Sequence, residues 1–253
     1  DDVAKQVEKG KSTFAGSEIQ VKTVCIVGLG AIGRKVAAAA HALGMSVTGY
    51  DPFISEQAKA EILFVTIFDD LRLAWKDADF VTLHVPMTAD NKGFIDKEAI
   101  ASMKDGVVLV NCARGELVNV SDVKDALQSK KMRKYVVDFP SEECLRHEGI
   151  IAIPHLGAST QEAEDNCAVM AATELKDYIE NGNIKNSVNM PNLSVEKCAK
   201  HRYTIISHDQ GENTFGGTSA TRNGIRYTIV DTDDPVNLQS IDDASVIKVR
   251  LVY

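Results

Sequence analysis

The sequence predicts an α/β fold, a doubly wound parallel sheet followed by a small α+β unit. Three observations favour this class. Apolar runs and helical stretches alternate from about residue 21 to residue 158, as they do when strands and crossover helices build a parallel sheet. A glycine-rich turn separates the first apolar run from the first helix of that region. Beyond residue 191 the long helices stop, and short strands with apolar-polar alternation follow.

The glycine-rich turn is Gly28-Leu-Gly-Ala-Ile-Gly33, which follows the apolar run 23–27 and opens an alanine-rich helix. The spacing G-x-G-x-x-G in this context predicts a dinucleotide site. Gly28 allows a tight turn, Gly30 lets the backbone approach a pyrophosphate, and Gly33 brings the helix against the strand. The phosphates then lie on free N–H groups at a helix N-terminus. Glycines that only cap a helix are the alternative, which we give about one chance in ten because strand, helix and a later acid occur together.

That acid is Asp51, 18 residues after Gly33 and directly after a second apolar run, 46–50. A carboxylate at this place can accept hydrogen bonds from the ribose hydroxyls of adenosine. The next residues, Pro52-Phe-Ile, offer no arginine for a 2′-phosphate. The sequence therefore predicts NAD rather than NADP.

The rest of the parallel region follows from its alternation. The run 106–111 is continuously apolar, which is typical of a central strand covered on both faces. Ser159 with Glu162 predicts a capping box for a long helix that ends at Gly182. Further strands are expected at 62–66, 80–84, 134–137 and 149–153, and further helices at 69–76, 97–103 and 120–129.

Beyond the linker at 183–196, strands are expected at 202–207, 215–221, 225–231 and 246–252. Asn223-Gly224 predicts a type I′ turn that joins the middle two as a hairpin.

The composition limits the function. The chain has 253 residues with 44% hydrophobic content, which suffices for one or two domains with real cores. A net charge of −8 argues against nucleic acid or an anionic membrane as the main partner. The five cysteines form no C-x-x-C pair, so we expect reduced thiols and no metal site. With no apolar run of membrane-spanning length and no signal-peptide pattern at its start, the chain is expected in the cytoplasm.

Three candidates for chemistry follow the later strands, whose carboxyl ends are where such a sheet binds its ligand. Arg114 can hold a substrate carboxylate through two parallel hydrogen bonds. His155 can take a hydroxyl proton while hydride leaves the same carbon. Glu142, or its neighbour Glu143, can orient that imidazole. Singly, each of these residues is more often structural or solvated, about three times in four, and their shared location changes the odds.

These residues resemble the D-2-hydroxyacid dehydrogenase family. The specific stretches are the glycine-rich turn, Leu83-His-Val-Pro-Met-Thr88, Asn111-Cys-Ala-Arg-Gly-Glu116 and Pro154-His-Leu-Gly-Ala-Ser-Thr160. The resemblance implies hydride transfer between NAD and C2 of a 2-hydroxy acid, with Arg114 on the carboxylate, His155 as acid/base, a glutamate behind the histidine, and Asp138 near the nicotinamide carboxamide. Within the family, a Phe-Pro-x-Glu setting favours Glu142 over Glu143. The resemblance also implies a homodimer or homotetramer. The expected cofactor contacts are Gly28, Gly30, Ala31, Ile32, Gly33, Tyr50, Asp51, His84, Val85, Pro86, Cys112, Ala113, Arg114, Asp138, His155 and Gly157.

The tail, 202–253, resembles the small regulatory ACT module, with both of its helices shortened, the second near residues 235–241. This likeness favours the branch of the family that oxidises 3-phospho-D-glycerate to 3-phosphohydroxypyruvate at the start of serine biosynthesis. The family also has a substrate lobe before the glycine-rich turn, and the 27 residues before Gly28 are too few for one. We therefore expect this chain alone to be poorly active.

The expected organisation is a lead-in helix and linker at 1–20, an NAD-binding domain at 21–158, a helix returning to the substrate lobe at 159–190, and a linker with the ACT-like unit at 191–253. Two other functions stay open. One is a non-catalytic protein that senses NAD(H), and the other is a dehydrogenase for another D-2-hydroxy acid or for formate.

Overall fold

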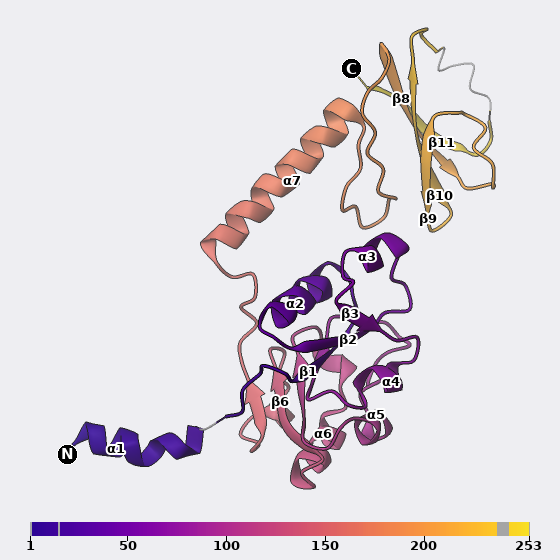
Figure 1. The fold of residues 1–253 in the computed structure, drawn as a ribbon. Helices are drawn as coiled ribbons and strands as arrows, with labels where there is room; N and C mark the ends of the chain where they lie inside the picture. The colour runs from indigo at the N-terminus through magenta and orange to yellow at the C-terminus, as the bar shows by residue number, and fades with distance from the viewer. Residues whose placement is uncertain (1, 15, 237–242, 253) are drawn as a thin grey trace. The chain divides into compact units, whose positions relative to one another are not determined.

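The chain forms two compact units, residues 1–156 and 157–253, in a computed structural model that describes residues 2–14, 16–236 and 243–252 (Figure 1). In the first unit the strands are β1 (Thr23–Val27), β2 (Ser46–Tyr50), β3 (Val65–Ile67), β4 (Phe80–Leu83), β5 (Val107–Asn111), β6 (Met132–Val137) and β7 (Ile150–Ala152). Its helices are α1 (Val3–Gly10), α2 (Ala31–Ala42), α3 (Glu56–Ala60), α4 (Leu71–Trp75), α5 (Lys97–Ser102) and α6 (Val120–Gln128), with short 3-10 turns η1 (Lys11–Phe14), η2 (Gly115–Leu117) and η3 (Glu142–Cys144).

The seven strands form one parallel sheet in the order β3-β2-β1-β4-β5-β6-β7. From β1 the chain moves outward to β2 and β3, then crosses back to place β4 on the other side of β1. The predicted doubly wound sheet is therefore confirmed, and its switch point lies between β1 and β4. Ligands of such sheets bind at the carboxyl ends of the strands beside that point.

Strand β1 shows why the sheet is covered on both faces. Val24 and Ile26 pack with Ala37 and Ala40 of α2. Successive side chains of a strand point to opposite faces. Cys25 and Val27 accordingly belong to the other core, which collects residues of α4, α5 and α6 around the fully buried Trp75. The side chains of this apolar run are therefore buried on both faces of the sheet.

In the second unit, the long helix α7 (Gln161–Asn181) precedes a sheet of β8 (His201–His208), β9 (Thr218–Arg222), β10 (Ile225–Thr232) and β11 (Val246–Val252). The N-cap of α7 was predicted one residue too early. Thr160 holds that position, and its hydroxyl accepts a hydrogen bond from the N–H of Ala163 at 3.2 Å. Both residues can cap a helix, so the sequence alone does not decide between them. The helix ends at Gly182 with positive φ, as expected.

The small sheet is antiparallel and has the order β11-β8-β10-β9. Asn223 and Gly224 join β9 to β10, and both have positive φ, which confirms the predicted hairpin turn. Strands β8 and β9 run in the same direction with β10 between them, as in a split βαβ unit. A loop replaces the helix between them. The ACT likeness stays a prediction, and the second shortened helix, expected near 235–241, falls mostly on residues outside the described ranges.

A buried ion pair holds the second unit together. Arg202, whose side chain is fully buried in β8, donates from Nε and Nη2 to the two carboxylate oxygens of Asp231 at 2.7 Å each. Its Nη1 donates to the backbone oxygens of Asn181, at the end of α7, and of Val195, in the linker. One guanidinium therefore connects helix, linker and sheet.

None of the helices in the described part of the chain combines the length and the apolar character that a membrane crossing needs.

Replacement of Asp231 by Asn should destabilise the second unit by about 3–5 kcal/mol, because it leaves the buried charge of Arg202 without its partner. Arg202 also holds the pKa of Asp231 at about 2, below the usual 3.8. A lowered carboxyl pKa adds stability above pH ~4 that is lost as pH falls toward 2. Hydrogen exchange should show reduced protection in β8 and normal protection in β1. Exposed Asp233→Asn is the matched control, and equal protection in both variants would contradict the assignment.

Candidate active site

The predicted site residues of the first unit gather at one edge of the parallel sheet. Strands β1, β2, β4, β5, β6 and β7 are parallel neighbours, so their carboxyl ends open on the same side. The residues that follow these ends are Gly28, Asp51, His84, Cys112, Asp138 and, after two further residues, His155. Gly157 opens the second unit, so its cofactor contact stays a prediction.

The glycine-rich turn is packed against its neighbours at two glycines. Gly28 has φ +95°, and a Cβ there would lie 2.7 Å from the backbone oxygen of His84. A Cβ at Gly33 would overlap the backbone oxygen of Gly28. Gly30 differs, because a Cβ at that position would have nothing within 4 Å. Gly28 and Gly33 are therefore required by the fold, whereas Gly30 leaves open space above the turn.

The first turn of α2 has free N–H groups. Side chains cap α3 to α7 at Ser55, Asp70, Asp96, Asn119 and Thr160. The N-cap of α2 is Gly30, which has no side chain to do so. The N–H groups of this turn, near Ala31 and Ile32, are thus left for an anionic group, and a helix N-terminus favours one electrostatically.

Asp51 is fixed beside this turn. Its Oδ2 accepts a hydrogen bond from the N–H of Leu29 at 2.8 Å, and its Oδ1 accepts one from the N–H of Phe53 at 2.9 Å. A carboxylate has lone pairs for about four hydrogen bonds. Asp51 can therefore hold the turn in place and still accept from two ribose hydroxyls.

Asn111 was named in the sequence only as part of a motif, and the structure gives it a defined role. It is 1% exposed at the end of β5. Its Nδ2 donates to the backbone oxygen of Arg114 at 2.8 Å, and its Oδ1 accepts from the N–H of Ala113 at 3.2 Å. A polar residue that ends an otherwise apolar strand was the signal for this role. Asn111 fixes the loop that carries Arg114.

Arg114 and His155 contact the same aromatic ring. The guanidinium carbon of Arg114 lies 5.5 Å from the ring centroid of Phe139. The imidazole of His155 packs on that ring with centroids 4.1 Å apart. Phe139 was not predicted to be a site residue, and it is the side chain that links the two polar candidates. Both Arg114 and His155 are exposed, so a ligand can reach them.

The carboxylate at His155 is that of Asp138. The Nδ1 atom of the imidazole donates to Oδ2 of Asp138 at 2.8 Å. Glu142, predicted for this place, lies on η3, and the described part of the chain shows no hydrogen bond between it and His155. Glu143 lies 4.0 Å from the ammonium of Lys124 instead. The catalytic role of Glu142 stays a prediction without a contact in its support.

Burial shapes the titration of the groups around this pair. Burial lowers the pKa of His84, so its imidazole is neutral at pH 7. Burial, with the charge of Asp138 nearby, raises the pKa of the Cys112 thiol. Burial also raises the pKa of Tyr135 to about 12. The thiol and the phenol are therefore protonated at neutral pH.

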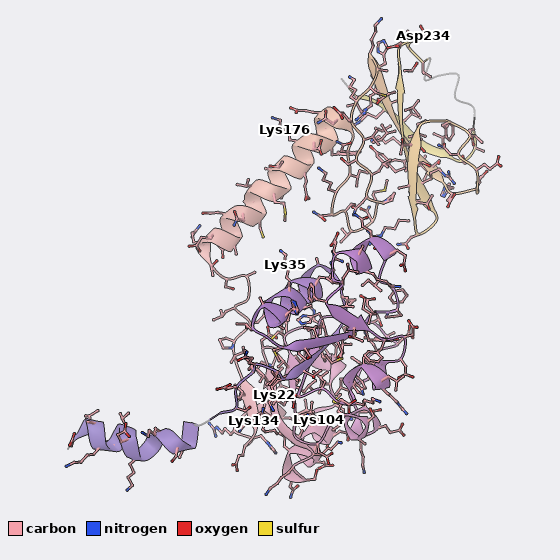
Figure 2. All side chains as sticks on the ribbon, in the orientation of Figure 1. Lys22, Lys35, Lys104, Lys134, Lys176 and Asp234 are labelled. Atoms are coloured by element: carbon pink, nitrogen blue, oxygen red, sulfur yellow. The ribbon has the colours of Figure 1, made fainter. Side chains whose placement is uncertain are left out.

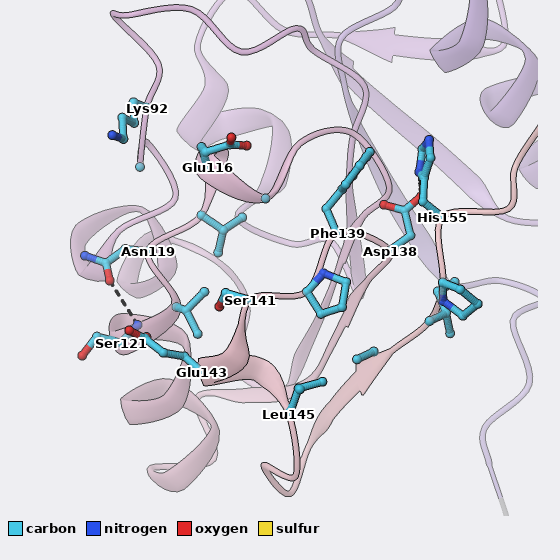
Figure 3. Close-up of a pocket in the computed structure, with 18 of the residues that line it drawn as sticks. Lys92, Glu116, Asn119, Ser121, Asp138, Phe139, Ser141, Glu143, Leu145 and His155 are labelled. Carbon is cyan, nitrogen blue, oxygen red and sulfur yellow. Dashed lines mark hydrogen bonds and ion pairs between the residues drawn. The ribbon is translucent and has the colours of Figure 1, made fainter.

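An open cavity of about 1440 Å³ borders this pair (Figure 3). In Figure 3 the carboxylate of Asp138 points toward His155, and Phe139 stands beside them, with Glu143 across the cavity near Ser121. The cavity also reaches Gly115, next to Arg114. Asp138, Phe139 and His155 line one side of this cavity.

The opposite edge of the sheet is different in character. Lys22 precedes β1, Lys104 precedes β5 and Lys134 lies near the start of β6, and Figure 2 shows these three lysines near one another. Lys104 is paired with Asp79 at 2.8 Å. Basic side chains thus lie at the amino ends of the strands, away from the predicted ligand.

The site residues fit a dinucleotide on two structural grounds. The turn of α2 offers uncapped N–H groups beside an open glycine, as a pyrophosphate needs. The second carboxylate oxygen of Asp138, Oδ1, is buried and has no hydrogen-bond partner. Such an orphaned acceptor is costly unless a ligand supplies a donor. The nicotinamide carboxamide, which the sequence analysis placed near Asp138, is a donor of the required kind.

Comparisons with known proteins agree with this geometry. Residues 1–157 match the family model described as D-isomer specific 2-hydroxyacid dehydrogenase, NAD binding domain. The D-3-phosphoglycerate dehydrogenase of Methanocaldococcus jannaschii is 39% identical over 214 residues, which are 82% of this chain and 41% of that protein. The D-3-phosphoglycerate dehydrogenase of Bacillus subtilis is 34% identical over 203 residues, 78% of this chain and 38% of that protein. The chain thus spans about two fifths of the length of these curated relatives.

Solved structures give the same result for the fold. The NAD-complexed form of a D-isomer specific 2-hydroxyacid dehydrogenase from Lactobacillus delbrueckii ssp. bulgaricus aligns with a TM-score of 0.61 and 26% identity, over 70% of this chain and 58% of that one. The apo D-mandelate dehydrogenase of Rhodotorula graminis aligns with a TM-score of 0.63 and 23% identity, over 73% of this chain and 55% of that one. At that identity the second match supports the fold alone.

Gly30 and Gly33 of the turn allow a direct test of the dinucleotide site. Gly30→Ala should fold normally, since its Cβ meets nothing, and should weaken NAD binding on the order of tenfold or more because the methyl group lies where the pyrophosphate approaches. Gly33→Ala should instead lower the thermal unfolding midpoint, because its Cβ overlaps Gly28. Calorimetric titration and thermal unfolding separate the two effects. If Gly30→Ala bound NAD as the wild type does, the pyrophosphate would lie elsewhere.

Proposed function

The chain belongs to the D-isomer specific 2-hydroxyacid dehydrogenases and carries their NAD-binding domain, and we propose that it serves the NAD-dependent oxidation of a D-2-hydroxy acid at C2. The observation that carries this proposal is the placement of Arg114 and His155 around Phe139, beside the predicted nicotinamide site. One group binds carboxylates and the other accepts protons. In this proposal a 2-hydroxy acid uses both groups.

In this proposal Arg114 binds the substrate carboxylate through two parallel N–H···O bonds, for which its planar guanidinium is suited. Asn111 keeps the loop of Arg114 in place. The hydroxyl group on C2 then faces His155, whose Nε2 accepts the hydroxyl proton as the C2–H bond breaks. NAD, when bound, supplies the acceptor for the hydride.

The proposed substrate is 3-phospho-D-glycerate, with 3-phosphohydroxypyruvate as product. Two observations support this substrate. The curated relatives at 34–39% identity share the name D-3-phosphoglycerate dehydrogenase. The strand order of the small sheet is compatible with the expected ACT-like tail. A different D-2-hydroxy acid is the alternative. A panel of D-2-hydroxy acids, assayed by NADH absorbance with the full-length gene product, decides between them. The proposed substrate requires the highest kcat/KM for 3-phospho-D-glycerate.

Arg114→Lys should lower kcat/KM about ten- to a hundredfold in the full-length gene product, with NAD affinity little changed. A lysine cannot make the bidentate contact, which costs about 1.5–3 kcal/mol. His155→Asn should lower kcat on the order of 10²–10⁴ by removing the acid/base. Initial rates of NADH formation measure both, and near-normal turnover in both variants would refute these roles.

Selectivity for NAD should depend on Asp51. Asp51→Ala should weaken NAD binding and reduce the difference in affinity between NAD and NADP. The carboxylate is expected to accept hydrogen bonds from the ribose, and it also accepts one from the N–H of Leu29. Parallel calorimetric titrations with the two cofactors test this. Equal affinity of the wild type for NAD and NADP would contradict the assignment.

The 253-residue chain, assayed by itself, should bind NAD and oxidise 3-phospho-D-glycerate very slowly. His155 has a side chain 51% exposed, and Arg114 is exposed too. Holding substrate and cofactor in the reactive orientation, away from water, can lower the barrier by ~7–11 kcal/mol in well-positioned cases. We expect exposed catalytic groups to lose much of this barrier lowering. Turnover within tenfold of that of the full-length relative from Bacillus subtilis would show that exposure does not limit the site.

A further inference from the structure

Asp138 occupies the place behind His155 that sequence reasoning gave to a glutamate. Its side chain is 8% exposed, against 51% for His155, and the two are joined by the hydrogen bond of 2.8 Å between Oδ2 and Nδ1. We infer that Asp138 is the residue that positions and polarises the His155 imidazole in this chain. The inference rests on the proposed function for its catalytic consequence, and on geometry alone for the contact.

The backbone of the parallel sheet holds this pair in register. Asp138 directly follows β6, and β7 pairs with β6 so that Val137 stands opposite Ala152. The N–H of Ile153 donates to the backbone oxygen of Val137 at 2.9 Å, which continues the ladder toward His155. On its other side, the N–H of Asp138 donates to the backbone oxygen of Asn111 at 3.4 Å. The position of the carboxylate is thus set by strands on both sides, and not by a loop.

The glutamates are placed less favourably. Only residues 139–141 separate Asp138 from η3, and Glu142 and Glu143 are both exposed on that turn. Figure 3 shows Glu143 on the far side of the cavity from His155, near Ser121. Its carboxylate faces Lys124.

The contact has a defined chemical effect. An ionised carboxylate can only accept hydrogen bonds, so Nδ1 of His155 carries the proton and Nε2 keeps its lone pair. That tautomer is the one able to take a proton from a substrate hydroxyl through Nε2. The carboxylate also stabilises the positive charge that the imidazole acquires when it does so. Phe139, packed on the ring at 4.1 Å, limits its rotation.

The tautomer of His155 can be measured directly on this chain with ¹⁵N-labelled histidine by NMR, at a pH where the imidazole is neutral. We expect the wild type to show protonated Nδ1 and unprotonated Nε2. Asp138→Asn should give a mixture of tautomers, or mainly protonated Nε2. The matched substitution Asp77→Asn, on an exposed residue before β4, should leave the ¹⁵N shifts of His155 unchanged. Protonated Nε2 in the wild type, or unchanged shifts in Asp138→Asn, would overturn the inference.

Measurements of kcat distinguish the role of Asp138 from that of Glu142. In the full-length gene product, Asp138→Asn should lower kcat on the order of 10²–10⁴, as expected when a histidine loses the carboxylate that sets its tautomer. Glu142→Gln should lower kcat less than Asp138→Asn does, and should leave the ¹⁵N shifts of His155 in place. The reverse order of the two activities would overturn the inference. A change in the ¹⁵N shifts of His155 in Glu142→Gln would overturn it even if Asp138→Asn failed to fold. A wild type without turnover of any D-2-hydroxy acid would refute the proposed function, while the NMR comparison would still decide the contact.

Discussion

The close approach of α2 to β1 is the constraint on which the site depends. It exists because Gly33 has no Cβ to meet the backbone oxygen of Gly28. Because α2 packs closely on β1, its uncapped N-terminus lies at the carboxyl end of β1. In the sheet, β1 lies between β2 and β4. Every other site residue of the first unit then needs only to follow a neighbouring parallel strand to reach the same edge. The absence of a Cβ at Gly33 thus sets where the predicted ligand site lies.

Hydrogen bonds within the protein fix that edge before any ligand arrives. Asp51 holds the turn through Leu29, Asn111 holds the loop of Arg114, and Asp138 holds His155. Groups oriented in advance need little reorganisation during a reaction, which is where much of the rate of an enzyme comes from. The exception is the unpartnered Oδ1 of Asp138. In the proposed function this atom would accept from the nicotinamide carboxamide, so that one carboxylate would serve both the histidine and the cofactor.

Local patterns were sufficient for the fold and for the cofactor turn. The glycine spacing, Asp51 and the alternation of strands and helices depend on a few neighbouring residues, and all are found in the structure as expected. The hydrogen-bond partner of His155 could not be predicted from local patterns. It lies 17 residues away in the sequence, and the register of β6 with β7 brings it to the histidine. The N-cap of α7 was also not decided by the sequence. Ser159 and Thr160 are both residues that cap helices, and the structure has Thr160 in that position. Asn111 acts on residues two and three positions later, and its polar side chain at the end of an apolar strand was a local signal. Phe139 gave no such signal, because it contacts His155 at the end of another strand.

The most direct measurement is an NMR titration of the ¹⁵N-labelled 253-residue chain with NAD, recorded as backbone amide shifts. If NAD binds where the structure places it, the largest changes fall on the turn Gly28–Gly33, on Asp51, and on the residues after β4, β5 and β6, up to Asp138 and His155. The amino-terminal edge near Lys22 and Lys104, and the small sheet around Arg202, stay unchanged. Changes concentrated at that basic edge, or in the small sheet, would contradict this account.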